Sequence, residues 1–186
     1  MTLYFFGVTP SDPLRERIDA FRAKWNHPHH KVEPHITLKA PFGWPGNPAP
    51  VLKAVQAVCA ASAPFTLTLG APGRFGGARV LFLSVAGEPL WTLQKAVVAA
   101  VMRFAPPERR GGPNEASDPY HPHLTLAATR FGIDAAGIAA MEREAGTALA
   151  GLPPFTVTAM RCYRKERDME RWQVCTDLPL GSTQSH

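Results

Sequence analysis

One short pattern of polar and apolar residues occurs twice in this chain. Residues 34–38 read Pro-His-Ile-Thr-Leu, and residues 122–126 read Pro-His-Leu-Thr-Leu. In a β-strand, side chains two positions apart share one face, and the residues between them lie on the other face. Each copy therefore predicts a strand with histidine and threonine on one face and aliphatic residues packed into a core. Two such strands in one chain favour two half-sites that face a single cleft.

A purely structural role is the alternative to this interpretation. Threonine is common in strands, and histidine is often half-buried for reasons of packing alone. A single His-x-Thr segment would therefore indicate little. The second copy, in matched surroundings, is what favours a functional site.

The length and composition are those of a globular domain. With 186 residues, of which 45% are hydrophobic and 19% charged, the chain can bury a full core, and we expect one domain over residues 1–186. No run approaches the roughly 20 apolar residues of a membrane helix, and no basic stretch precedes the apolar N-terminal residues. We therefore expect no membrane association and a cytoplasmic location, and we expect the protein to work as a monomer. The three cysteines lack CxxC spacing and indicate neither a disulfide framework nor a zinc ribbon.

The charge of the chain is positive. The formal net charge is +5, the pI is near 9.4, and most of the 20 basic residues are arginine. The planar guanidinium group suits phosphate, and excess positive charge attracts polyanions. A generally basic surface would give the same composition. Together with the histidine pairs, however, the charge favours a substrate that carries phosphate.

The order of expected helices and strands also repeats. Strands expected at 3–8 and 80–85 each precede a helix start that contains proline, and Pro64–Thr68 resembles Pro154–Thr158. Helix and strand alternate in both parts of the chain, which indicates a duplicated unit. The expected boundaries are 1–78 and 79–180 for the two units, with 181–186 as a tail.

Three further local expectations come from residue types. The glycine-rich segment 70–77 predicts a turn, and residues 120–127 predict the strand that carries the second histidine. Apolar residues at steps of three and four predict one helix face. That face consists of Leu90, Leu93, Val97, Val101 and Phe104.

The two polar pairs have a clear chemical use. The reference pKa of histidine, near 6.5, allows proton uptake and release near neutrality, so His35 and His123 could act as acid and base together. Displacement at phosphorus places the entering and leaving oxygens roughly opposite each other, which suits that division. The hydroxyl groups of Thr37 and Thr125 could donate to the non-bridging oxygens. This scheme requires no metal and no cofactor.

These segments resemble those of a known family. The stretches His-Ile-Thr-Leu-Lys-Ala-Pro-Phe and His-Leu-Thr-Leu-Ala look like the two-histidine (2H) phosphoesterase superfamily, and most like its bacterial 2′,5′-RNA ligase-like RNA 2′,3′-cyclic phosphodiesterases. The resemblance implies an α+β fold that is bilobal and pseudo-symmetric. In that fold, duplicated α/β units form two antiparallel sheets around a central cleft, with helices outside.

The same resemblance implies an activity. RNA 2′,3′-cyclic phosphate ends, for example on tRNA halves, would be hydrolysed to 2′-phosphate without a cofactor. His35 would protonate the leaving 3′ oxygen, and His123 would activate water. Pseudo-symmetry makes these two roles easy to exchange. An RNA 5′-hydroxyl in place of water would give the reverse reaction, a 2′,5′ ligation.

Candidate residues for substrate binding are less distinct. Phe42 and Tyr120 could stack on a base at the rim of the cleft, although core packing is the alternative for each. Arg130 could contact phosphate, but strand alternation would turn it away from the face of His123 unless the strand bends. Lys39 follows the first segment and is turned away in the same manner. Solvated charges are the alternative for both cations.

Three other functions remain open at this stage. A metal site could be built from His27, His29, His30, His35, His121 and His123, but their spacing lacks the i, i+4 pattern of a zinc helix, and no carboxylate lies with them. A non-catalytic protein that binds RNA ends is the second. The third is a phosphodiesterase for a small cyclic phosphate, either a cyclic nucleotide or an ADP-ribose cyclic phosphate.

Overall fold

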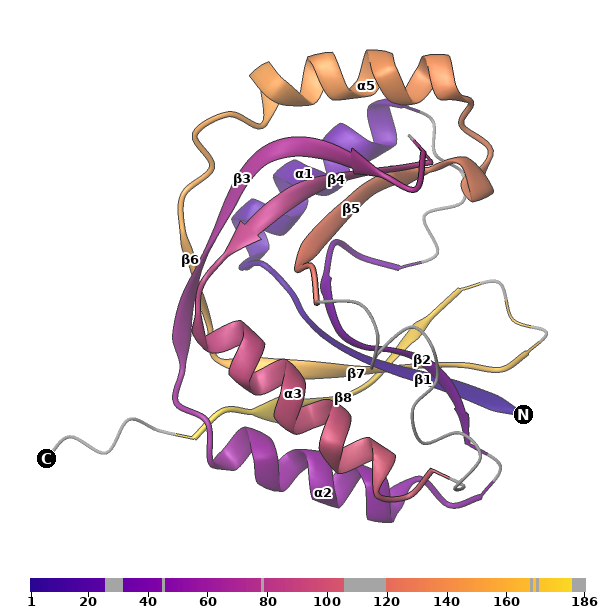
Figure 1. Cartoon of the computed structure of the whole chain (residues 1–186), viewed down its shortest axis with the longest axis vertical. Coiled ribbons are helices and arrows are strands. Elements are labelled where there is room, and N and C mark those ends of the chain that lie inside the picture. Colours follow the sequence, from indigo (N-terminus) through magenta and orange to yellow (C-terminus); the bar gives the residue numbers. More distant parts are fainter. Residues whose placement is uncertain are drawn as a thin grey trace, which may run out of the picture.

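The computed structural model describes residues 1–25, 32–44, 46–77, 79–105, 120–167, 169 and 171–181. Strands and helices alternate along the chain (Figure 1). The strands are β1 (Thr2–Val8), β2 (Ile36–Trp44), β3 (Phe65–Phe75), β4 (Val80–Ala86), β5 (His123–Ala128), β6 (Phe155–Val157), β7 (Ala159–Lys165) and β8 (Gln173–Pro179). The helices are α1 (Asp12–Lys24), α2 (Ala49–Ala60), α3 (Pro89–Met102), α5 (Ala135–Ala148) and the short 3-10 helix η2 (Thr129–Phe131).

The strands form one antiparallel order, β6-β3-β4-β5-β2-β1-β7-β8. It consists of a β5 half (β6, β3, β4 and β5) and a β2 half (β2, β1, β7 and β8). The two halves are joined between β2 and β5, where Ile36 is paired with Leu124. The α+β fold class is therefore confirmed. The expected detail of two antiparallel sheets is not confirmed, because the strands form one eight-stranded order.

Helices lie beside each half of the sheet. Figure 1 shows α1 and α5 with the β5 half, and α2 and α3 with the β2 half. Apolar residues at helical spacing face inward, as in α5, where Ile138, Met141 and Ala145 are buried. Among the described residues, no helix is long and apolar enough to span a membrane.

The two halves of the sheet do not follow the two halves of the sequence. β3, from the first expected unit, pairs with β4 from the second, and β7 pairs with β1. Each half of the sheet therefore takes strands from both parts of the chain. The duplicated unit over 1–78 and 79–180 stays a prediction.

The turn expected at 70–77 is shorter in the structure, because strand β3 occupies most of that segment. β3 continues to Phe75, and a register shift between Leu69 and Pro72 accommodates the extra residues as a bulge. A Cβ atom at Gly70 would lie 2.5 Å from the Ser84 hydroxyl oxygen, so glycine allows this close approach between strands. The turn itself lies at Gly76 and Gly77, which have φ values of 66° and 64°.

Two other local expectations were partly wrong. The second histidine strand begins at His123 rather than at residue 120, because Tyr120 belongs to the irregular segment before it. Helix α3 ends at Met102, and Phe104 is 38% exposed. The remaining residues of that predicted face, from Leu90 to Val101, are buried as expected.

Candidate active site

The join between the two halves brings the two His-x-Thr segments together. Ile36 and Leu124 are paired across the join, and both side chains are fully buried. If this antiparallel register is continued by one residue on either side, His35 lies across from Thr125, and Thr37 lies across from His123. Because neighbouring residues alternate in direction, all four polar side chains project from the face opposite the two buried aliphatic residues.

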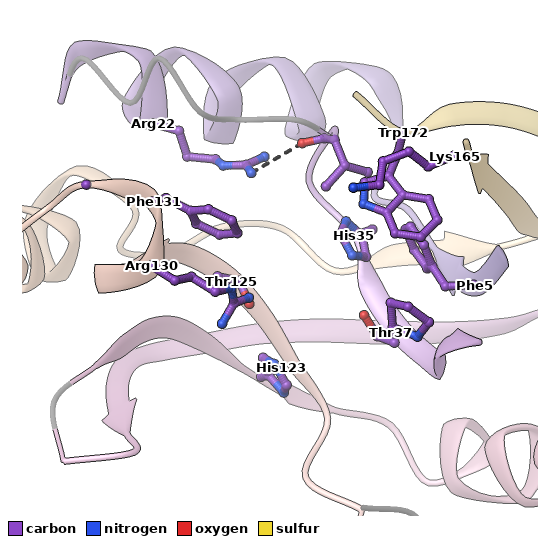
Figure 2. Close-up of a pocket in the computed structure, with 13 residues that line it drawn as sticks. Phe5, Arg22, His35, Thr37, His123, Thr125, Arg130, Phe131, Lys165 and Trp172 are labelled. Atoms are coloured by element: carbon purple, nitrogen blue, oxygen red, sulfur yellow. Dashed lines mark hydrogen bonds between the residues drawn. The ribbon is translucent and has the colours of Figure 1, made fainter. Parts of the chain in front are cut away.

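These four side chains line one cavity of about 710 Å³ (Figure 2). Its volume lies in the usual range of small-molecule sites. The remaining lining residues are aromatic, cationic or small. They are Phe5, Phe131 and Trp172; Arg22, Arg130 and Lys165; and Val32, Pro41 and Gly132.

Both imidazole rings are oriented by the same backbone contact. The Nδ1 atom of His35 lies 2.8 Å from the carbonyl oxygen of Glu33, and the Nδ1 atom of His123 lies 2.8 Å from that of His121. A carbonyl oxygen can only accept, so each Nδ1 must carry the hydrogen. In each neutral ring Nε2 then has the free lone pair. The two half-sites therefore offer the same ring nitrogen for proton exchange with a ligand.

The His35 ring is enclosed by aromatic side chains. Its centroid lies 4.9 Å from that of Phe5 and 5.7 Å from that of Tyr163, and these two rings stack on each other at 4.3 Å. The pKa of His35 is lowered to about 4, chiefly by burial. Positive charge on Arg22 and on His123 also lowers this pKa, whereas the hydrogen bond to the Glu33 carbonyl raises it. Burial therefore favours the neutral form of His35.

The His123 ring meets aromatic edges instead. The ring of Phe75 lies 4.8 Å away at nearly a right angle, and that of Phe82 lies 5.7 Å away. Burial lowers the pKa of His123, and the hydrogen bond to the His121 carbonyl opposes that shift. Positive charge on His121 and on Arg130 lowers the pKa further.

Arg130 lines the cavity, although strand alternation predicted the opposite direction. β5 ends at Ala128, and the 3-10 helix at Thr129–Phe131 changes the direction of the backbone. The guanidinium carbon of Arg130 then lies 4.5 Å from the centroid of the Phe131 ring. The bend that the sequence argument required is therefore present.

Two more cations line the cavity. The ammonium group of Lys165 lies 5.5 Å from the ring centroid of Trp172. Arg22 is only 4% exposed; it contacts the carboxylate of Asp19 at 3.1 Å and donates to the carbonyl of Val32 at 3.3 Å. Burial lowers the pKa of Arg22 to about 10, and it still carries its charge near neutrality. With Arg130, these side chains give the cavity a positive wall, which suits an anionic ligand.

Phe42 and Tyr120 do not line the cavity. The Phe42 ring packs between those of Tyr4 and Phe6, with centroid distances of 6.2 and 6.1 Å. The Tyr120 hydroxyl donates to the carbonyl of Thr37 at 2.9 Å, which ties the segment before His123 to β2. Their role in substrate binding stays a prediction.

Lys39 is another departure from expectation. It is 5% exposed, its ammonium group lies 5.2 Å from the centroid of the Phe42 ring, and it donates to the carbonyl of Ala40 at 3.3 Å. The expectation that Lys39 is a solvated charge is therefore wrong.

Sequence reasoning missed Phe5, Trp172 and Lys165. Phe5 pairs with Tyr163 across β1 and β7, and Lys165 lies two residues farther along β7 on the same face. Those strands are distant in the sequence, so no local pattern could have linked them to His35. Phenylalanine, tryptophan and lysine are also common in strands and loops, so these residue types do not by themselves indicate a site.

The structure describes only part of the proposed metal cluster. Within the described residues, no group of three or more His, Cys, Asp or Glu side chains is arranged to hold a metal ion. His27, His29 and His30 lie outside the described residues.

Comparison with known families agrees with this geometry. The sequence profile of the 2′-5′ RNA ligase superfamily matches residues 10–169, a span that contains both His-x-Thr segments. This chain belongs to the 2′-5′ RNA ligase superfamily. Among curated proteins, a candidate phosphoesterase of Bacillus cytotoxicus is 28% identical over 127 residues, which are 64% of this chain and 66% of that protein.

Solved structures show how far the superfamily fold extends over the chain. TT0787 of Thermus thermophilus matches with a TM-score of 0.70 and 21% identity, covering 98% of this chain and all of that one. E. coli LigT complexed with 3′-AMP matches with a TM-score of 0.61 and 20% identity, covering 97% of this chain and 98% of that one. The superfamily fold therefore accounts for nearly the whole chain.

Proposed function

We propose that this protein hydrolyses RNA 2′,3′-cyclic phosphate ends to 2′-phosphate ends. The observation that carries the proposal is the pair of histidines that line one cavity with the same free ring nitrogen. Two threonines and three cationic side chains also line this cavity, whose volume and positive charge suit a nucleotide with its phosphate. Membership of the 2′-5′ RNA ligase superfamily favours RNA as the substrate class, with tRNA halves as one example.

The proposed reaction uses the histidines as acid and base. His123 accepts a proton from water, whose oxygen bonds to phosphorus while the bond from phosphorus to the 3′ oxygen breaks. His35 gives a proton to that leaving oxygen, and the phosphate stays on the 2′ oxygen. The hydroxyls of Thr37 and Thr125 donate to the non-bridging oxygens, where negative charge increases in the transition state. All four side chains belong to one chain, so the proposed site is complete within a monomer.

Substrate must change the protonation of His35 in this scheme. Burial favours the neutral ring, whereas an acid has to be protonated. A phosphodiester anion beside the ring favours the imidazolium form and raises the pKa of His35. Substrate binding is therefore accompanied by proton uptake. The dependence of turnover on pH is bell-shaped, because one ring must be charged and the other neutral.

The reverse reaction follows from the same transition state. An RNA 5′-hydroxyl in place of water would attack the cyclic phosphate and form a 2′,5′ linkage. Water is far more concentrated than RNA ends, so hydrolysis dominates. LigT has been crystallised with 3′-AMP and with phosphate, and the substrate proposed for this protein carries groups of these kinds.

The decisive experiment identifies the product. An oligonucleotide with a 2′,3′-cyclic phosphate end is incubated with the protein, and the monoester is assigned by phosphorus NMR or by its resistance to a 3′-phosphatase. We expect a 2′-phosphate, formed equally well in EDTA. A 3′-phosphate would reverse the roles of the 2′ and 3′ oxygens. No turnover, or activity that EDTA abolishes, would reject the proposal.

A small cyclic phosphate is the second candidate substrate. The cavity volume of about 710 Å³ is sufficient for one nucleotide and does not by itself require a polymer. Values of kcat/KM for a cyclic-phosphate oligonucleotide, a cyclic mononucleotide and an ADP-ribose cyclic phosphate separate the two. A clear preference for the oligonucleotide supports RNA, and equal or higher values for a small compound support the second candidate.

A further inference from the structure

A group of charged and polar side chains lies behind His35 and does not line the cavity. At its centre is the carboxylate of Glu33, whose Oε1 accepts from Arg161 at 2.6 Å and from the Tyr163 hydroxyl at 2.9 Å. The other oxygen, Oε2, lies 3.4 Å from Nε of Arg15. Arg161 also donates to both oxygens of Asp177, at 2.6 and 2.8 Å. One carboxylate is therefore held by α1 and by two positions on β7.

The backbone of Glu33 performs a different task from its side chain. Its carbonyl oxygen accepts the Nδ1 hydrogen of His35, the contact that orients the ring. Glu33 precedes β2, and the recorded pairing of β2 with β1 begins at Ile36. No ladder pair places the carbonyl of Glu33. Ladder hydrogen bonds fix the backbone farther along the strand. At Glu33, the contacts of the side chain fix the backbone instead.

We call the contacts of the Glu33 carboxylate with Arg15, Arg161 and Tyr163 the Glu33 anchor. The surroundings of this anchor make it strong. The side chains of Glu33 and Arg161 are each 21% exposed, so the pair is partly shielded from solvent. Charge-assisted hydrogen bonds of this kind are shorter and stronger than neutral ones. The pKa of Arg161 is raised, mainly by its hydrogen bonds to Asp177 and then to Glu33. The pKa of Asp177 is lowered, chiefly by the hydrogen bond from Arg161, so the ion pair between these two side chains persists across the neutral range.

Within the part of the chain that the structure describes, the second histidine has no such anchor. The corresponding carbonyl belongs to His121, an exposed residue whose ring is 6.5 Å from that of His123. Its side chain is an imidazole, which offers no carboxylate to bind arginine. The anchor is therefore a property of the His35 half-site and not of the repeated segment.

We propose that Glu33 is a positioning residue for His35: its carboxylate, held by Arg161 and Tyr163, fixes the backbone carbonyl that sets the tautomer and orientation of the His35 ring. This role rests on the proposed function for its effect on turnover. Its effect on the ring does not depend on which substrate is used.

The test compares three variants. Glu33→Ala removes the carboxylate, and Glu33→Gln removes its charge but keeps an acceptor oxygen. Asp177→Asn weakens the ion pair between Asp177 and Arg161 and leaves Glu33 unchanged. For each, kcat and KM are measured on the cyclic-phosphate oligonucleotide, Tm is recorded, and the tautomer of His35 is read from nitrogen-15 NMR shifts of its ring. Wild-type protein is the reference, and the ring measurement requires no activity.

We expect Glu33→Ala to lower kcat by about ten-fold to a hundred-fold with KM within about three-fold, as for a misplaced catalytic group. Its NMR spectrum should show loss of the single Nδ1-H tautomer of His35. Glu33→Gln should retain most of both properties, and Asp177→Asn should lower Tm with little change in kcat. If the His35 tautomer is unchanged in Glu33→Ala, or if kcat in all three variants follows Tm alone, the positioning role is wrong. Absence of turnover in the wild type, with the tautomer change intact, rejects the proposed function and leaves this role standing.

Discussion

The two half-sites share a sequence pattern and a backbone contact, but differ in what surrounds them. The ring of His35 lies against Phe5 and Tyr163, and its pKa is lowered to about 4 by burial. His123 meets the edges of Phe75 and Phe82. A repeated segment can thus fix which atoms face a ligand while distant strands set the protonation of each copy.

The neighbouring strands explain the difference. On β1, the residue paired with Thr37 is Gly7, where a Cβ atom would lie 2.8 Å from the Ile36 carbonyl oxygen and 3.5 Å from the His35 ring. On β4, the residue paired with Thr125 is Phe82, whose ring reaches His123. A missing side chain in one half and a large one in the other give the two similar histidine segments different surroundings.

Removal of either histidine is expected to have the largest effect. His35→Ala and His123→Ala should each lower kcat by at least about 1,000-fold, because each removes one proton transfer. Affinity for the cyclic end should stay within a few-fold. The double variant should be little worse than either single one, since the two rings act as a unit. Single-turnover rates and equilibrium binding are the measurements.

His121→Ala is the matched control for that comparison. His121 precedes His123 by two residues, its side chain does not line the cavity, and the backbone carbonyl is retained in the variant. Its kcat should stay within about three-fold of wild type. Should only one of the two catalytic substitutions reduce turnover, the division into acid and base would be incorrect.

The stability of the protein should reveal the difference in burial. The pKa of His35 is near 6.5 when unfolded and about 4 when folded, so the unfolded state binds more protons between these values. The free energy of unfolding should therefore fall as the pH drops from about 6.5 to 4, by at most about 3 kcal/mol from this residue. Denaturant titrations across that range measure it.

Variants assign that dependence to one half-site. His35→Gln should flatten the fall in stability more than His123→Gln, because the pKa of His35 is strongly lowered by enclosure. Equal flattening in both variants would show that the two rings are equally shielded. Other titrating groups remain in both proteins and cancel from the comparison.

Much of this site could be predicted from the sequence, and the reason is local. Alternation along β2 and β5 places His35, Thr37, His123 and Thr125 without knowledge of other strands, and the structure brings all four to one cavity. The location of Arg130 depends on where β5 ends, which alternation alone does not give. Residues contributed by long-range pairing could not be predicted, because such pairing leaves no mark on the neighbouring sequence.

The aromatic residues show the same limit. Phe42 and Tyr120 are near the histidines in the sequence, yet Phe42 packs against the core and Tyr120 donates to a backbone carbonyl. Phe5 and Trp172 are far from either histidine segment and line the cavity. Proximity along the chain is therefore a poor guide to which aromatic side chain faces a ligand.

The two threonines should have intermediate and similar effects. Thr37→Val and Thr125→Val keep the shape of the side chain and remove its hydroxyl. Each should lower kcat by about ten-fold to thirty-fold, with Tm unchanged, since a donor to the transition state is lost. A larger loss for one threonine, measured as kcat on the same oligonucleotide, would identify the half-site that holds more of the developing charge. Wild-type kcat in both variants would contradict a role for the hydroxyls.

The cations at the cavity should have the smallest effects. Arg130→Ala should raise KM by about five-fold, and Lys165→Ala by about two-fold, because an arginine suits phosphate better than a lysine. Both effects should shrink when salt is added, since partly exposed charges are screened. Initial rates at two ionic strengths test this. A KM that does not change in either variant would assign phosphate binding to other groups.

The recorded pair that joins the halves, Ile36 with Leu124, has a mechanical consequence. Each residue of this pair directly follows a histidine. A rotation of one half of the sheet relative to the other would therefore have its hinge close to the two rings. In such a rotation, the displacement of an atom increases with its distance from the hinge. Such a rotation would hardly alter the spacing of the imidazoles while it widened or narrowed the distant rim of the cavity.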